Sequence, residues 1–443
     1  KECVLSGLLS KAGRRVLHLD RNSYYGGSSA CCDLSKLFEA YGESAPDQSV
    51  AGALGNPQSY FVDSAPKFML IKGKLATILM DTGAHRHMQF RRVDDSLVMR
   101  NGELYHPPTT GKEVTTSPLV SIQEKIQASR FFAWVNRYKP DDPSTHLAGV
   151  VRKTTLNLPQ MSGASFLQYW QLQPTTIELA MRGVALYQDD SYLNHPASEL
   201  VRRMQLFRDS ISVGSETQGS PFLYPLYGMG ELPQAFSRLS SVFGGTFLLD
   251  RPVDEVLYDE NGGASGVRCG DEKAFARCVI GDPSYFPSKV KTTHHIVRVL
   301  AIMRHALHGT DGKPSCQVTV PASQLGREHD VHVVAVNAEH EVCPKDLWIG
   351  AASTVVEGPL DGANVKEIAD RELGPALAML QPAEKYFVEV VPYQEPTSNG
   401  LAERTFVTSS ADASSHVEAA MDEVISIYYR LTGTWPEALM RRQ

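Results

Sequence analysis

The opening segment restricts the possible folds of this chain more than any other. Residues 2–13 are mostly apolar and predict a helix that ends at a glycine. A short apolar run at 16–19 predicts a strand that Asp20 closes, and the pair Gly26-Gly27 follows shortly after. A helix, a glycine and an apolar strand closed by an acidic residue form the second half of a dinucleotide-binding βαβ unit. The opening therefore predicts an α/β fold that contains this unit.

The register of the unit indicates a decayed nucleotide site. Counted back from Asp20, the third glycine of the G-x-G-x-x-G fingerprint should stand where the chain has Glu2. That glycine lets a pyrophosphate approach the helix N-terminus, and a carboxylate there repels a second anion. In FAD enzymes a Gly-Asp or Gly-Glu pair that binds flavin precedes the last helix, but here Thr408-Ser-Ser-Ala-Asp412 precedes a helix expected at 415–432. We expect no FAD, and the degenerate site comprises Glu2, Asp20, Gly26 and Gly27.

The length and composition of the chain limit the number of domains, the class of ligand and the compartment. At 443 residues the chain exceeds what one hydrophobic core usually supports, so we expect two domains. The net charge of −7 argues against non-specific nucleic-acid binding. No apolar run approaches the roughly 18 residues of a membrane span, so any membrane role is expected to be peripheral. Seven cysteines without a Cys-x-x-Cys pair disfavour a disulfide framework and a structural zinc site, and they favour a reducing cytosol.

The middle of the chain has a helical composition. Apolar residues at helical spacing predict one stripe of Ile122, Ile126, Phe131, Phe132 and Val135, and further helices at 165–172, 175–187 and 198–211. We interpret 117–216 as a small all-helical domain inserted into a discontinuous domain of residues 1–116 and 217–443. Such helices can simply pack their own core, or they can surround a cavity for an apolar ligand, and both readings stay open.

The remaining segments predict strands and hairpins. Asn101-Gly102 lies between two apolar runs and is a strong hairpin signal. Apolar runs separated by turns continue through 244–290 and 317–350, in an order similar to that of amine oxidases and related flavoproteins. The predicted fold class is thus α/β: a FAD/NAD(P)-binding-like, multi-sheet domain of the flavoprotein monooxygenase/amine oxidase type, with an inserted helical domain.

The stretch 224–239 predicts an amphipathic helix with Pro233 near its start. At 100° per residue, one stripe contains Leu232, Ala235, Phe236, Leu239 and Phe243. The opposite face displays Glu231, Gln234 and Arg238. A solvated polar face would explain this pattern, and so would a binding surface.

Three segments together resemble a known family. The runs 2–7, 16–27 and 221–257 are similar to those of the Rab GDP-dissociation inhibitors, within the GDI/Rab escort protein superfamily. The resemblance implies a non-enzymatic regulator that binds GDP-bound, geranylgeranylated Rab GTPases, inhibits GDP release and extracts them from membranes for recycling in vesicular traffic. It further implies a monomer in the cytosol with transient membrane contact. Because the family's first strand and glycine loop precede Glu2, the chain is expected to lack about one strand and one turn.

The resemblance also implies site residues. A Rab-binding platform is expected at Tyr25, Glu231, Gln234, Arg238, Thr246 and Leu248. Residues expected to surround the prenyl groups in the helical domain are Phe132, Val135, Leu167, Leu179, Val184 and Met204. The chain departs from the family in three places: Leu248 stands where Met is common, Asn56 and Gln58 stand near the family's arginines, and the loop 214–220, which the family links to membrane engagement, is longer.

Two alternatives remain at this stage. A Rab escort protein, which presents Rab to a geranylgeranyltransferase, would usually be longer. A flavin-dependent amine oxidase or desaturase is opposed by Glu2 and by the missing glycine near Asp412. No G-x-S-x-G, Walker A or H-E-x-x-H motif occurs, and the pairs His85/His87 and His294/His295 have no third ligand nearby, so we assign no catalytic or metal site.

Overall fold

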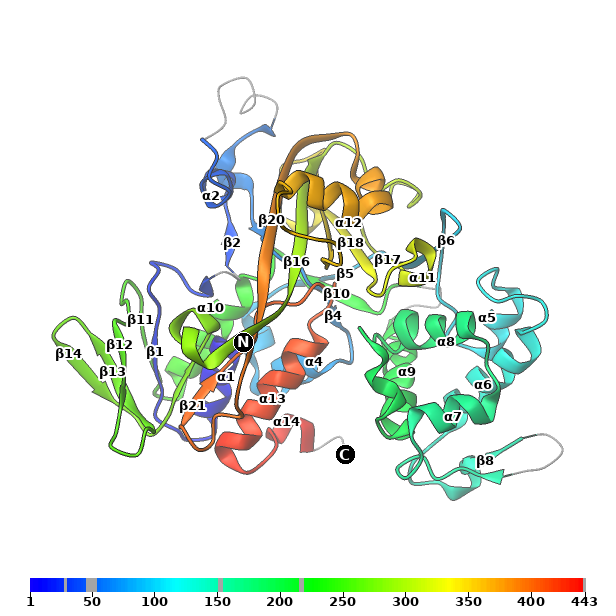
Figure 1. Ribbon diagram of the computed structural model, residues 1–443, viewed down its shortest axis with the longest axis horizontal. Coiled ribbons are helices and arrows are strands. Elements are labelled where there is room, and N and C mark those ends of the chain that lie inside the picture. Colours follow the sequence, from blue (N-terminus) through cyan, green and yellow to red (C-terminus); the bar gives the residue numbers. More distant parts are fainter. Residues whose placement is uncertain (28–29, 45–53, 150–153, 215–218, 441–443) are drawn as a thin grey trace.

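The computed structural model describes residues 1–27, 30–44, 54–149, 154–214 and 219–440. A long sheet occupies the upper centre of the molecule, the opening α/β unit lies to its left, and a group of helices lies at the lower right (Figure 1). This mixed α/β architecture with a multi-stranded sheet confirms the predicted fold class.

The opening segment folds as predicted. Helix α1 (Glu2–Lys11) leads into strand β1 (Leu17–Leu19), which pairs in parallel with β11 (Thr246–Leu248). Helix α10 (Glu231–Val242) packs along α1, and the two approach so closely that a Cβ on Gly7 would lie 2.8 Å from the Phe236 ring. A small residue is therefore required where the two helices cross.

The large sheet has seven strands in the order β20-β16-β19-β18-β17-β6-β7. Their bounds are Ala383–Pro396, Val290–Met303, Trp348–Val355, Val331–Asn337, Ser315–Val320, Asp95–Arg100 and Glu103–Tyr105. Every pair is antiparallel except β17 with β6. The turn between β6 and β7 contains Asn101 at φ 52° and Gly102 at φ 83°, so the hairpin predicted from this dipeptide is confirmed.

Helix α12 (Val365–Leu380) covers one face of this sheet. Alternate residues of β16 point to opposite sides: Val297 and Val299 join the core under α12, whereas Leu300 and Ile302 join the core on the other face. The remaining strands form small two- and three-stranded sheets: β2 Cys31–Cys32, β3 Val62–Asp63, β4 Met69–Leu70, β5 Phe90–Arg92, β8 Leu147–Ala148, β9 Thr154–Thr155, β10 Phe222–Pro225, β12 Glu255–Tyr258, β13 Ala264–Cys269, β14 Glu272–Phe275, β15 Val279–Gly281 and β21 Thr405–Val407.

Five helices and a π-helical segment form the group at the lower right (Figure 1). They are α5 Gly111–Thr116, α6 Lys125–Arg137, α7 Gly163–Trp170, α8 Pro174–Glu178, the π-helix Leu179–Val184 and α9 Ala197–Ile211. The helix predicted over 175–187 is therefore present as α8 followed directly by the π-helix, but it ends at Val184, before the predicted end. The division of the chain at 117 and 216 stays a prediction.

The apolar stripe predicted for α6 is wrong at one end. Ile122 lies before the helix and is 85% exposed, and Ile126 is 66% exposed. Nine residues separate Ile126 from Val135, which places them on opposite sides of a helix at 100° per residue. The buried face consists of Ala128, Phe131, Phe132, Trp134 and Val135.

One hydrophobic core extends from the helical group into the sheet region. Phe207 of α9 and Phe222 of β10 have ring centroids 6.3 Å apart, and Phe222 and Phe68 are 6.2 Å apart. The same buried cluster includes Leu300 and Phe387 of the large sheet. The two regions therefore share apolar packing at their junction.

Three properties of the described residues concern membrane spans, disulfides and metal ions. No helix in the described ranges is long and apolar enough to cross a membrane. All seven cysteines are free. The described part of the chain contains no group of three His, Cys, Asp or Glu placed to hold a metal ion. Residues 215–218 of the loop noted at 214–220 lie outside the described ranges.

Candidate functional site

Helix α10 has the predicted buried apolar face and the predicted exposed polar face. Leu232, Ala235, Phe236 and Leu239 are buried, while Gln234 and Arg238 are exposed and Glu231 is half-buried. We call Glu231, Gln234 and Arg238 the α10 row. Gln234 Nε2 donates to Glu231 Oε1 at 3.4 Å, and burial raises the pKa of Glu231. The row thus offers carboxylate, amide and guanidinium groups to a partner.

Phe243 does not continue the buried stripe. It is 47% exposed because α10 ends at Val242, and Phe243 takes the cap conformation of φ −94° and ψ 18°. The prediction that placed Phe243 in the apolar stripe is therefore wrong, since helical periodicity no longer applies beyond the last helical residue.

Tyr25 lies beside the first turn of α10. Its half-buried ring meets Phe247 edge-on, with centroids 5.8 Å apart and planes at 73°. Gly26 adopts φ +99°, and a Cβ there would lie 2.7 Å from Cγ of Pro233. Only glycine allows this loop to lie so close to the helix, so Gly26 serves as a structural link between Tyr25 and α10.

Thr246 and Leu248 occupy a different face of the same neighbourhood. Both are exposed and, as alternate residues of β11, point to the same side, whereas Phe247 points to the other side and stacks on His18 at 4.3 Å. The structure therefore packs the Tyr25 ring on Phe247 and its neighbour Gly26 against Pro233 of α10, and it leaves Thr246 and Leu248 on the outward face of the β1–β11 pair.

A buried polar cluster beneath α10 was missed from the sequence. The Asp63 side chain accepts from Met229 N at 2.8 Å and from the Tyr224 hydroxyl, and its other oxygen lies 2.8 Å from Cys31 Sγ. Gly230 N donates to Cys31 Sγ at 3.1 Å. Burial raises the pKa of Asp63, and the hydrogen bonds that it accepts oppose the rise. We call Asp63, Cys31 and Tyr224 the Asp63 anchor.

The residues of the predicted nucleotide site bind their own chain. The Glu2 carboxylate, at the start of α1, accepts from the Thr408 hydroxyl at 2.6 Å. Asp20 accepts at 2.9 Å from both the backbone and side-chain nitrogens of Asn22, so it stabilises its own turn. Gly27 has φ +53° in the same loop as Gly26.

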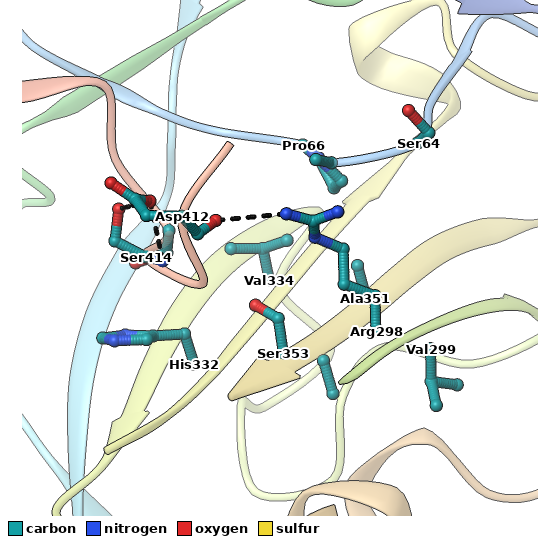
Figure 2. A pocket seen from close by; sticks show the side chains of 13 residues that line it. Ser64, Pro66, Arg298, Val299, His332, Val334, Ala351, Ser353, Asp412 and Ser414 are labelled. Atoms are coloured by element: carbon teal, nitrogen blue, oxygen red, sulfur yellow. Dashed lines mark hydrogen bonds between the residues drawn. The ribbon is translucent and has the colours of Figure 1, made fainter. Parts of the chain in front are cut away.

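The segment before helix α13 (Glu418–Thr432) is held from several sides. Lys67 Nζ contacts the Asp412 carboxylate and donates to Ser414 O at 2.6 Å, and Arg298 Nη2 donates to Ala411 O at 2.6 Å. Figure 2 shows Arg298, His332 and Ser353 of the large sheet facing this segment across a small cavity. The cavity has room for about one water molecule.

The candidate prenyl-binding residues are all buried in the shared core. Their exposed fractions are 0% for Phe132 and Val135, 1% for Val184, 2% for Met204, 3% for Leu167 and 6% for Leu179. Phe131 and Phe132 pack edge to face at 5.4 Å. Phe132 and Val135 come from α6, Leu167 from α7, Leu179 and Val184 from the π-helix and Met204 from α9, and the core cluster unites them.

The fold is of the predicted α/β, FAD/NAD(P)-binding-like class. An oxidoreductase from Methanosarcina mazei has a similar fold, with a TM-score of 0.56 at 14% identity over 96% of both chains. A family model described as GDP dissociation inhibitor matches residues 1–440. The chain belongs to the GDP dissociation inhibitor family, which confirms the resemblance found in the sequence.

Individual relatives agree with this assignment. The Rab GDP-dissociation inhibitor of Saccharomyces cerevisiae is 37% identical, covering 100% of this chain and 94% of that protein. A Schizosaccharomyces pombe protein described as "Probable secretory pathway GDP dissociation inhibitor 1" is 40% identical over 98% of this chain and 94% of its own length. The crystal structure of a Rab GDI from Plasmodium falciparum superposes with a TM-score of 0.86 at 32% identity, covering 98% and 96% of the two chains.

Proposed function

We propose that this protein binds Rab GTPases in their GDP-bound, prenylated form, slows GDP release and keeps them soluble for recycling between membranes. The observation that carries the proposal is the exposed α10 row, displayed on a chain of the GDP dissociation inhibitor family. Tyrosine and arginine dominate energetic hot spots of protein interfaces, and Tyr25 and Arg238 are the candidates here. Thr246 and Leu248, exposed on a neighbouring face, are further candidate contacts on β11.

The helical group is the proposed place for the isoprenoid. Each lipid CH₂ gains about 0.8 kcal/mol in a bilayer, so extraction requires comparable apolar burial in the protein. The six candidate residues supply that chemistry, but they are packed against one another, so the helices must separate to admit a lipid. Lipid uptake on this proposal is accompanied by a rearrangement of α6, α7, α9 and the π-helix.

The proposed function is tested by comparing the binding of GDP-loaded and GTP-loaded Rab. Immobilised protein should retain prenylated Rab loaded with GDP and release most of it when the Rab carries a non-hydrolysable GTP analogue. Prenylated Rho GTPases serve as a control for capture by the lipid alone. Equal retention of the GDP and GTP forms would contradict the proposal.

We further propose that the protein acts without FAD and without catalysis, as a monomer in the cytosol. Two contacts support the part of the proposal that concerns FAD: Glu2 bonds Thr408 at the start of α1, and Lys67 and Arg298 hold the segment before α13, the two segments whose sequences depart from the FAD pattern. Purified protein is expected to show no flavin absorbance in the visible spectrum, even after incubation with excess FAD. A yellow protein with near-stoichiometric flavin would refute this part.

A further inference from the structure

The buried carboxylate of Asp63 lies next to the start of α10. Helix α10 begins after Gly230 and has no side-chain cap of its own. The first amides of a helix need partners, and a negative charge is favourable there because of the helix dipole. Asp63 accepts from Met229 N, and Cys31 Sγ accepts from Gly230 N. The Asp63 anchor, supplied by strands β2 and β3, thus holds the turn that leads into α10, and the first helical amides, of Glu231 and Leu232, donate to Gly228 O and Met229 O of that turn.

Two glycines at the start of α10 allow the close contact with Cys31 and Asp63. A Cβ on Gly228 would lie 2.7 Å from Cys31 Sγ and 3.2 Å from both Asp63 oxygens, and a Cβ on Gly230 would lie 2.7 Å from Cys31 N. Gly228 also adopts φ +80°. Both glycines are therefore required for α10 to start this close to the anchor.

Cys31 and Asp63 face each other in the register of β2 and β3. Asp63 is 5% exposed and Tyr224 is 1% exposed, so neither side chain is placed to touch a docked protein. Any effect of these two residues on binding must be indirect, through the turn before α10 and the position of Glu231.

We propose that Asp63, with Cys31 and Tyr224, positions the start of α10, and with it the α10 row, for GTPase binding. The proposal rests on the proposed function and assigns to that surface a support that lies beneath it. If the anchor loosens, the turn before α10 and the first turn of the helix fray, and Glu231 loses its fixed position.

The test compares two matched substitutions. Tyr224→Phe removes the hydroxyl that bonds Asp63, while Tyr60→Phe removes an equally buried hydroxyl that donates to Leu54 O at 2.6 Å. Tyr224→Phe and Asp63→Asn are expected to weaken binding of GDP-loaded, prenylated Rab by about fivefold, as the loss of one buried hydrogen bond of about 1 kcal/mol implies. Tyr60→Phe should leave that affinity unchanged, and all three variants should bind a free geranylgeranyl probe as the parent protein does.

Amide hydrogen exchange supplies an independent readout. Exchange at 229–232 should rise by about fivefold in Tyr224→Phe and stay at the parental rate in Tyr60→Phe. Unchanged exchange and unchanged Rab affinity in Tyr224→Phe would overturn the proposal, as would equal losses of affinity in both tyrosine variants. If Asp63→Asn fails to fold, Tyr224→Phe decides alone.

A failure of the proposed function gives a different pattern. If neither Glu231→Gln nor Arg238→Ala changes Rab affinity, the α10 row is not the binding surface, and faster exchange in Tyr224→Phe then marks a structural support of α10 without a role in binding. A double-mutant cycle completes the test: Asp63→Asn and Glu231→Gln together should cost less affinity than the sum of the two single losses. Additive losses would contradict a role through Glu231.

Discussion

Phe132→Ala is expected to lower the free energy of unfolding by about 3–5 kcal/mol, the range for truncation of a buried aromatic side chain. Phe132 is 0% exposed and packs edge to face against Phe131 in the core that unites the helical group with the sheet. The truncation leaves a cavity that the neighbouring helices can fill only in part. Denaturant unfolding followed by circular dichroism measures the change.

Ile126→Ala is the matched control, because it truncates an apolar residue of the same helix. Ile126 is 66% exposed, and the expected change is within about 0.5 kcal/mol. The sequence pattern placed both residues in one buried stripe, whereas the structure buries only Phe132. The two substitutions therefore test which of these descriptions is correct. Comparable losses in both variants would show that Ile126 is buried in solution.

Arg238→Ala is expected to weaken binding of GDP-loaded, prenylated Rab by about tenfold, or about 1.4 kcal/mol, while the unfolding transition stays at its parental position. Arg238 is exposed on α10, so its removal leaves no cavity and no buried partner. Titration calorimetry or surface plasmon resonance with prenylated Rab gives the affinity.

Lys366→Ala removes another exposed cation, in the first turn of α12, and should leave Rab binding unchanged. This control matters because the loss of any cation changes long-range electrostatic attraction. An affinity of Arg238→Ala within about twofold of the parent protein would remove Arg238 from the candidate surface.

Local patterns in the sequence predicted the local structure well. The apolar spacing of 232–239 fixed the buried side of α10, and Asn101-Gly102 fixed the hairpin, because both signals depend only on neighbouring residues. The α/β class followed from the order of helix, glycine and strand at the start of the chain. The π-helix could not be predicted, since side-chain spacing over one turn does not separate it from an α-helix.

Contacts between residues that lie far apart in the chain could not be predicted from the sequence. Asp63 bonds Tyr224 and Met229, which are 161 and 166 residues further along the chain, and no local pattern marks such a pair. The same limit applies to Glu2 and Thr408, separated by 406 residues. Glu2 could be identified as wrong for a nucleotide, but the group that it binds instead became visible only in the fold.

Packing at the junction of the two regions has a thermodynamic consequence. Phe207 lies in the core that would have to admit a lipid, and its neighbour Phe222 belongs to β10, the strand that also carries Tyr224. On the proposed function, separation of the helices would therefore displace the strand that supports α10. An isoprenoid whose binding shifted this packing would then change the affinity for the GTPase, and by reciprocity a docked GTPase would change the affinity for the isoprenoid by the same factor.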